Sequence, residues 1–264
     1  MAQSSGPFLL YRPGPPLSEF VDSFWIYEGY APPHGLERLL PTGTTELIFT
    51  VDANGRAASG VAGARSECLL LDTSTPFSVI AVHFRPGGAF PFFGAPSNEL
   101  HNRSVALDLV WGRYAASVSD RLWEANTAES RFQLLEESLL TKARGRLDRH
   151  PAVRYALDVF EQSNGARAVG NVVQGIGISS RRFWELFRNE VGLAPKTFCR
   201  IRRFNEVLRH IERLATVDWL DVALSCGYFD QAHFNHDFRA FAGLSPSAYL
   251  RDRMSRTHVV VTDQ

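Results

Sequence analysis

Cysteine is scarce in this chain of 264 residues, which contains only Cys68, Cys199 and Cys226. The three lie far apart in sequence and form no CxxC pair, which argues against a disulfide framework and against a structural zinc site. A reducing compartment suits such a chain. We therefore expect a cytoplasmic protein without a metal or another cofactor.

An excess of charge of either sign is also missing, because 28 Lys and Arg balance 28 Asp and Glu. Overall charge thus gives no indication of nucleic-acid binding, and any basic surface has to be local. One such segment exists, since residues 177–213 carry nine Lys and Arg but four Glu. No window approaches 18 consecutive apolar residues, and no basic region precedes a long apolar run at the N-terminus. We expect neither a membrane span nor a signal peptide.

The part of the chain over residues 20–93 consists of short apolar or alternating runs between turn residues. Val, Ile, Phe, Trp and Tyr are common in these runs, which predicts the strands of an antiparallel sheet or small barrel. The best hairpin turn is DANG at 52–55. After Pro96 the apolar residues recur at helical spacing, which predicts helices over 113–124 and 130–144.

A polar stretch, KARGRLDRHP at 142–151, ends in proline and predicts a domain boundary. We expect a β-rich domain with trailing helices over residues 1–145, an all-helical domain over 150–253 and a tail over 254–264. The predicted fold class is therefore α+β.

The helical domain begins with a short helix, a glycine-bearing turn at 175–178 and a second helix. Ser179 is a good N-cap for this second helix, and Gly192 ends it. The helical period predicts an inner stripe of Phe183, Leu186 and Phe187. The predicted outer side then carries Ser180, Arg181, Trp184, Glu185 and Arg188. A short helix, such a turn and a helix with an exposed basic face form the helix-turn-helix signature. We therefore predict a first DNA-binding unit here.

The same pattern then recurs. Asp218 is a predicted cap of a short helix, GlyTyrPhe at 227–229 turns the chain, and a longer helix follows over 230–241. Phe234 and Phe238 are its predicted core residues. A long helix over 195–214 joins the two units, so we predict two helix-turn-helix units held at a fixed separation.

Two stretches of this domain resemble the AraC/XylS transcription activators. They are GISSRRFWELFRNEVGLAPKTFCRIRRFNEVL (177–208) and WLDVALSCGYFDQAHFNHDFRAFAGLSPSAYLR (219–251). The second is the more specific, and its order is close to the family signature at Ala223, Gly227, Tyr228, Gln231, Phe234, Phe238, Gly243, Pro246 and Tyr249. The resemblance implies a bacterial-type transcription regulator, an activator in most relatives, that binds promoter or operator DNA and contacts RNA polymerase.

The resemblance also places functional residues on this sequence. Base-reading positions fall on Arg181, Trp184, Glu185, Gln231, Ala232, His233, Asn235 and His236. Contacts to backbone phosphates are expected from Ser180, Arg182, Arg188, Lys196, Arg200, Arg202, Arg203 and Arg239. Arg can pair with guanine, Gln and Asn with adenine, and Glu with cytosine.

The first unit departs from the family pattern. Glu185 stands where a cation or an amide is expected, and it could select cytosine or repel phosphate. Gly170 and Gly175 lie in the supporting helix, where each costs about 1 kcal/mol relative to alanine. We expect the two units to contribute unequally to binding.

The N-terminal part resembles AraC-type N-domains of obscure function through LeuPro-x-Gly at 40–43 and PheArgProGlyGly at 84–88. This resemblance implies a cupin-like barrel that senses a small effector or forms a homodimer. Candidate effector-pocket residues are Trp25, Tyr27, Glu46, His83 and Arg85. The alternative is that the aromatic pair belongs to the core and the polar residues face solvent at alternate strand positions.

Two rival functions stay open. One is a metal-dependent cupin-type enzyme or a protein similar to DNA-repair methyltransferases, with an AraC-like module. Against an enzyme, His34, His83 and His101 form no HxH pair, and Cys68 has no neighbouring cysteine. His233 and His236 have a spacing that suits a metal, but they lack further ligands at ligand spacing. The second rival is an adaptor that binds no DNA.

Overall fold

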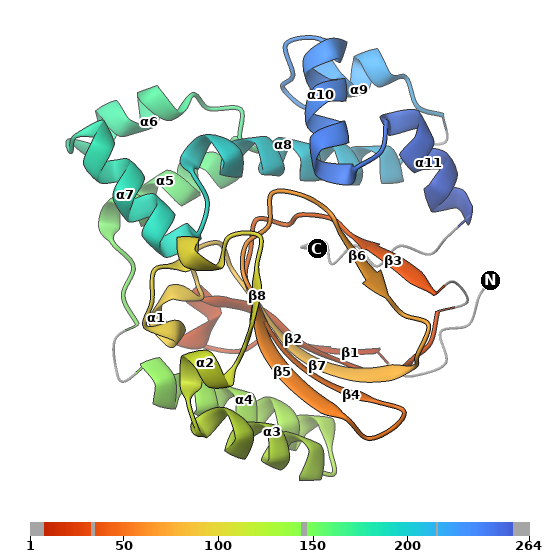
Figure 1. The fold of residues 1–264 in the computed structure, drawn as a ribbon. Helices are drawn as coiled ribbons and strands as arrows, with labels where there is room; N and C mark the ends of the chain where they lie inside the picture. Colours follow the sequence, from red (N-terminus) through yellow and green to blue (C-terminus); the bar gives the residue numbers. More distant parts are fainter. Residues whose placement is uncertain (1–7, 33–34, 144–146, 215, 256–264) are drawn as a thin grey trace.

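The computed structural model describes residues 8–32, 35–143, 147–214 and 216–255 (Figure 1). The middle of the predicted boundary segment, 144–146, and nearly all of the predicted tail, 256–264, lie outside the described residues, as does His34. A β-sheet lies below a set of helices in this view, and two further helices cover the far side of the sheet (Figure 1). The α+β class is confirmed.

Two antiparallel sheets make up the β-rich part. The larger has six strands in the order β1-β2-β7-β4-β5-β8, and the smaller pairs β3 with β6. The strands are β1 (Phe8–Tyr11), β2 (Val21–Tyr30), β3 (Leu36–Leu39), β4 (Glu46–Asp52), β5 (Ala57–Ala62), β6 (Leu69–Asp72), β7 (Phe77–Phe84) and β8 (Ser104–Ala106). The described strands of the larger sheet form an open sheet with β1 and β8 at its two edges. The separate pair of β3 and β6 lies over the concave face of this sheet (Figure 1).

The predicted hairpin at 52–55 is confirmed. It joins β4 to β5, Asp52 Oδ1 accepts from the Asn54 and Arg56 amides at 2.9 Å each, and Gly55 has a φ of +75°. Strand β1 was not predicted. The prediction of helical structure from Pro96 onward is wrong over residues 104–106, because these residues form the strand β8 and pair with β5. Three residues are too few for periodicity to separate strand from helix, and the pairing partner is distant in sequence.

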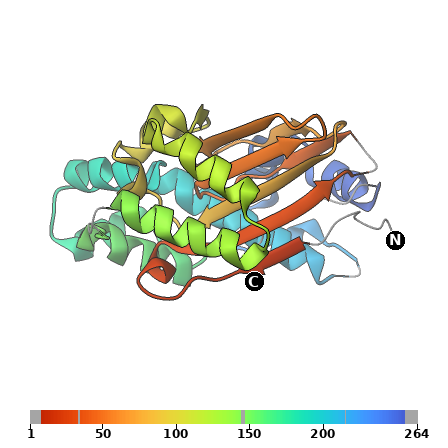
Figure 2. The same cartoon turned by 90° about the horizontal axis from the view of Figure 1, so that it is seen from below.

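The convex face of the larger sheet is covered by helices. Figure 2 shows the last two of them side by side across the sheet, α3 (Tyr114–Glu124) and α4 (Ala128–Ala143). The short helices α1 (Phe90–Phe93) and α2 (Asp108–Trp111) lead to this pair. Together with the sheet they bury one hydrophobic core, which includes Phe24, Phe49 and Leu135. The two longer predicted helices are thus confirmed to within a few residues.

In the described part of the chain after residue 143, seven helices follow and bury a second core around Phe160, Phe198 and Phe238. They are α5 (Pro151–Gln162), α6 (Val169–Ile176), α7 (Ser180–Val191), α8 (Pro195–Glu212), α9 (Trp219–Ser225), α10 (Gln231–Ala242) and α11 (Pro246–Ser255). No described helix is long and apolar enough to cross a membrane.

The sheet contacts the helical part through one of the motifs singled out in the sequence. In the LeuPro-x-Gly motif, Gly43 has a φ of +80° and lies against Phe198 and Ile201 of α8. Nearby, Arg38 Nη1 donates to the Ala242 carbonyl at the end of α10, over 2.9 Å. The motif therefore holds the sheet against the helix that joins the two helix-turn-helix units.

The second motif also lies at this contact. Gly87 of PheArgProGlyGly has a φ of +69° and lies against Val191 of α7 and Leu157 of α5, and Arg149 Nη2 donates to the Pro86 carbonyl at 3.0 Å. Both motifs thus position the helical part. The domain limits stay a prediction.

Candidate nucleic-acid interface

The first helix-turn-helix unit consists of α6, a turn and α7. Gly177 ends α6 with a φ of +77°, and the Ser179 hydroxyl then accepts from the Arg182 amide at 3.2 Å. Phe183 and Phe187 are fully buried on the inner side of α7. The predicted cap and the predicted inner stripe are confirmed.

The outer face of α7 carries the residues that the sequence placed there. Arg181, Trp184, Glu185 and Arg188 are exposed, Trp184 to 38%. Arg181 Nε donates to Glu185 Oε1 at 3.1 Å, and Arg182 Nη1 lies 3.8 Å from Glu185 Oε2. Glu185 therefore pairs with two cations of the same helix in the unbound protein, which the sequence did not reveal.

The second unit repeats this geometry with α9 and α10. The Asp218 carboxylate accepts from the Leu220 amide at 2.9 Å and so caps α9. Gly227 turns the chain with a φ of +78°, and Asp230 caps α10 by accepting from the His233 amide at 2.7 Å. Both units therefore have the helix, turn and helix that the sequence predicted.

The outer face of α10 is polar. The residues exposed there are Gln231, Ala232, Asn235, His236 and Arg239, whereas His233 is half-buried. Phe234 and Phe238 are fully buried, as predicted. A surface pocket of about 450 Å³ is lined by Ala232, Asn235, His236, Arg239 and Ala240.

Sequence reasoning missed Asp237, which is 1% exposed and lies between α10 and α8. Its Oδ1 accepts from Arg200 Nε at 3.0 Å and from Arg200 Nη2 at 2.7 Å. Arg203 lies beside it, with Nη1 donating to the Gly227 carbonyl at 3.3 Å and the guanidinium 5.1 Å from the Tyr228 ring centre. The two arginines fasten α8 to the second unit. The sequence signal that could have revealed Asp237 is an acidic residue three positions after Phe234, on the inner side of a predicted helix.

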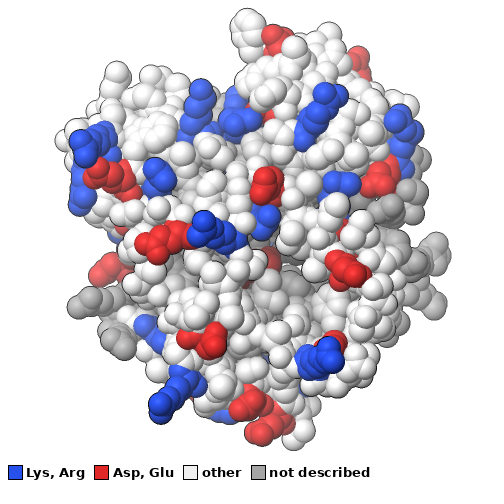
Figure 3. Space-filling view, in the orientation of Figure 1, with Lys and Arg blue, Asp and Glu red and all other residues white. Residues whose placement is uncertain are grey.

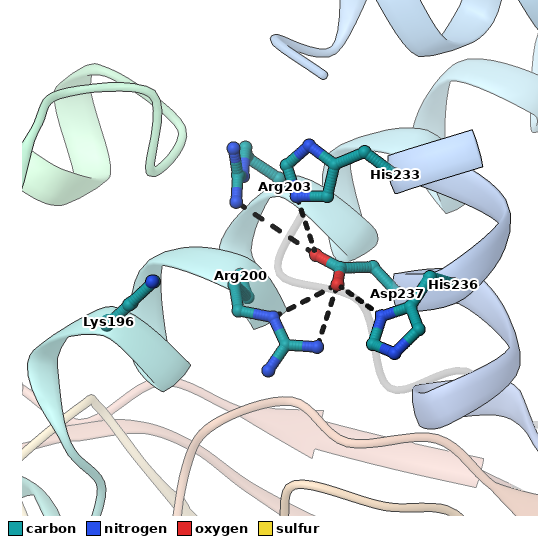
Figure 4. Close-up of a pocket in the computed structure, with 6 residues that line it drawn as sticks. All are labelled: Lys196, Arg200, Arg203, His233, His236 and Asp237. Atoms are coloured by element: carbon teal, nitrogen blue, oxygen red, sulfur yellow. Dashed lines mark hydrogen bonds and ion pairs between the residues drawn. The ribbon is translucent and has the colours of Figure 1, made fainter. Parts of the chain in front are cut away.

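Two other expected phosphate ligands lie on α8. Lys196 is exposed in the first turn of α8, and Arg202 is half-buried on the same helix. Lys196, Arg200, Arg203, His233, His236 and Asp237 together line a second surface pocket of about 450 Å³ (Figure 4). Figure 3 shows that Lys and Arg side chains gather over the helical part of this face, with a few acids among them.

The thiols of the helical part are buried. Burial raises the pKa of Cys199 to about 12 and that of Cys226 to about 11, so both stay protonated near neutrality. Nucleophilic chemistry requires the thiolate. Among the described residues, no three His, Cys, Asp or Glu side chains are grouped so that they could hold a metal ion.

Four of the five candidate effector residues share one face of the larger sheet. Trp25 pairs with Ala81 in register, and Glu46 pairs with His83, so Trp25, Tyr27, Glu46 and His83 point to the side of the small sheet. His83 is buried, and its Nδ1 lies 3.1 Å from Glu46 Oε1. Arg85 lies elsewhere. It is exposed, and its Nε donates to the Ser18 carbonyl at 2.8 Å.

Two families match the chain. The first is described as a domain of unknown function (DUF6597) and matches residues 10–106. The second is described as a helix-turn-helix domain and matches residues 172–252, which contain both units. The second match supports the AraC-type resemblance of the sequence over this part of the chain. A helix-turn-helix domain supports a DNA-binding transcription regulator.

Solved structures are similar to this chain over different parts of its length. The C-terminal domain of AraT from Geobacillus stearothermophilus has 22% identity, covers 44% of this chain and 93% of its own, and gives a TM-score of 0.36. An apo ToxT variant from Vibrio cholerae has 10% identity, covers 95% of this chain and 98% of its own, and gives a TM-score of 0.42. ToxT with bound unsaturated fatty acid gives 9% identity, 95% and 97% coverage, and a TM-score of 0.41. Among curated proteins, none matches the chain.

Proposed function

We propose that this regulator reads DNA with α7 and α10, each placed in one segment of the major groove. The observation that carries the proposal is the pair of capped helices with polar outer faces, joined by α8. With 18 residues and a rise of about 1.5 Å per residue, α8 spans about 27 Å. Successive major-groove segments on one face of B-DNA lie about 34 Å apart. One chain could thus cover two turns of DNA.

Within this proposal the residues divide into two classes. Arg181, Trp184, Gln231, Ala232 and Asn235 contact base edges, and the flanking cations contact phosphates. Glu185 pairs with Arg181 in the unbound protein and is left out of the base contacts. The base-contacting role is supported by the exposure of these side chains on the outer faces of α7 and α10. Arg203 is half-buried, and its contacts with Gly227 and Tyr228 favour a bracing role for that side chain.

The N-terminal part has a regulatory role in the proposal, through a small effector or a second copy of the chain. The shared face of Trp25, Tyr27, Glu46 and His83 supports an effector site, since it combines aromatic surface with a partly buried polar pair. The contact of Arg38 with the end of α10 gives a physical route, because a ligand that moves β3 would also move the second unit. Contacts with RNA polymerase follow from the family alone.

The test is selection of binding sites from a random duplex library with the full-length protein. We expect one enriched sequence with two half-sites and a binding constant that falls with salt. Arg181→Ala should reduce discrimination at one base pair by about 1 to 3 kcal/mol. Arg188→Ala should weaken binding to all DNA sequences by the same factor.

The adaptor alternative gives a different result. If the full-length protein enriches no sequence and shows no salt-dependent binding to DNA, the proposed function is wrong. If both arginine variants lose affinity equally on matched and mismatched sites, the division into base and phosphate contacts is wrong.

A further inference from the structure

Asp237 lies at the floor of the pocket between α8 and α10, and its two oxygens differ. Oδ1 accepts both hydrogen bonds from Arg200. Oδ2 is buried and accepts no hydrogen bond from any described residue. The nitrogens nearest to it are His233 Nε2 at 3.8 Å and Arg203 Nη2 at 4.0 Å. One carboxylate oxygen is therefore satisfied, whereas the other lacks a donor.

Positive charge dominates the rest of the pocket. Lys196, Arg200 and Arg203 come from successive turns of α8, and Asp237 is the only acid among the described residues that line the pocket. Figure 4 shows Lys196 on one side and the two histidines on the other, with Asp237 between them. The arginines are already held in place, so an anion would meet donors that need little reorganisation. The pocket suits an anion of the size of a phosphate group.

The position of the pocket indicates the source of that anion. His236 lines this pocket and also the neighbouring one, which contains Asn235 and Arg239 on the outer face of α10. A phosphate in the first pocket would thus lie beside the helix face that is proposed to meet base edges. Backbone phosphates flank base edges in this way in duplex DNA.

We propose that this pocket binds one phosphate of the DNA backbone, with His233 and His236 as protonated phosphate ligands and not as base readers. The proposal rests on the proposed function, because DNA supplies the phosphate. A protonated His233 would donate to Asp237 Oδ2 or to the phosphate. His236 Nδ1 lies 3.6 Å from Asp237 Oδ1. A protonated His236, at the rim of the pocket, would likewise donate to Asp237 or to the phosphate.

The surrounding charges explain why protons would be taken up on binding. His233 faces Asp237 of its own helix, Arg203 of α8 and the Tyr228 ring, whose centre is 5.2 Å away. His236 faces Asp237 and the pocket cations Lys196 and Arg200, with Arg239 on its other side. A phosphate would add negative charge beside the two imidazoles, and an opposite charge nearby favours the protonated form of an imidazole. Binding of DNA is therefore linked to protonation.

The experiment measures binding of the full-length protein to its selected duplex at pH 6.0, 7.0 and 8.0 and constant ionic strength. We expect affinity to fall by about fivefold or more over this range, in which histidine ordinarily loses its proton. The variant H233Q/H236Q should lose this dependence. His210→Gln, a change on α8 outside the pocket, should retain it. Circular dichroism checks that each variant is folded.

A second arm locates the phosphate. Duplexes that each carry one neutral methylphosphonate should show a position at which the wild type loses affinity, and Lys196→Met should remove the difference at that position. The sequence preference of H233Q/H236Q should equal that of the wild type.

Three results would overturn the proposal. They are retention of the pH dependence by H233Q/H236Q, a changed base preference of that variant, and competition by micromolar pyrophosphate that depends on Lys196, which would assign the pocket to a free polyphosphate. If the wild type binds no DNA at any pH, the proposed function fails as well, so the two failures are distinguishable.

Discussion

Arg181 donates through Nε to Glu185 Oε1 over 3.1 Å, so a proposed base reader of α7 is paired with an acid one turn further along the same helix. The Arg181 side chain is 91% exposed, and the pair is open to solvent. In water such a pair contributes little to folding, because solvent screens it. The pair affects DNA binding, because Arg181 must either break its hydrogen bond to Glu185 or keep it while it also donates to a base.

Removal of this acid should therefore strengthen DNA binding. For Glu185→Gln we expect an affinity about two- to fivefold higher, the range that corresponds to an exposed ion pair. Fluorescence anisotropy with the selected duplex measures the change, and Glu129→Gln on α4 is the control. An unchanged or lower affinity would show instead that Glu185 contacts the DNA, as selection of cytosine requires.

The contact between β3 and the end of α10 should stabilise the whole chain. Arg38→Met leaves the Ala242 carbonyl without this donor, and we expect a loss of about 1.5 to 3 kcal/mol in the free energy of unfolding. Hydrogen exchange should increase first in α10 and α11. Arg113→Met, an exposed change at the start of α3, should leave both quantities unchanged. Equal effects of the two variants would argue against a specific contact.

Gly88 of the second motif has no room for a side chain. An added Cβ would overlap the Phe20 carbonyl oxygen, so Gly88→Ala should cost at least about 2 kcal/mol of folding free energy. The control is Gly14→Ala, where nothing lies within 4 Å of the added carbon, and it should stay within about 0.5 kcal/mol. Thermal unfolding compares the two. Equal melting temperatures would show that the Phe20 backbone moves aside without cost.

Glu190 gives the protein a pH dependence of known sign. Burial raises the pKa of this carboxyl, although the His150 amide donates to it at 3.2 Å. A raised pKa in the folded state means that the protonated form stabilises the fold below the unfolded-state pKa. That stability is lost as pH rises through the folded-state pKa. Glu190→Gln should thus be more stable than the wild type at neutral pH, and the difference should vanish in acid.

Asp52 is the control of opposite sign. Hydrogen bonds from the Arg56 and Asn54 amides lower its pKa, so its stabilising effect is present above the unfolded-state pKa and lost as pH falls. Asp52→Asn should therefore be less stable than the wild type at neutral pH. Urea unfolding from pH 4 to pH 8 measures both variants. A constant difference for Glu190→Gln across this range would contradict the assignment.

Local chemistry alone determined much of the helical part. Ser179, Asp218 and Asp230 are each followed by a helix, and glycines with positive φ end or separate the helices at 177, 192, 227 and 243. Caps and turns act over three or four residues, so a sequence pattern contains all the information they need. The inner stripe of Phe183 and Phe187 followed from period alone, and so did the exposure of Arg181 and Trp184.

Tertiary structure decided what the side chains do after the helices form. The sequence predicted Arg200 and Arg203 as phosphate contacts, and only the packing of α10 placed Asp237 beside them, 34 or more positions away in the chain. Arg38 and Ala242 meet across 204 positions, and β8 became a strand only because β5 was there to pair with it. Such contacts depend on which elements pack together, and their sequence separation leaves no local pattern. The sequence therefore specified the two DNA-binding units, whereas packing determined which of their charges remain available for DNA.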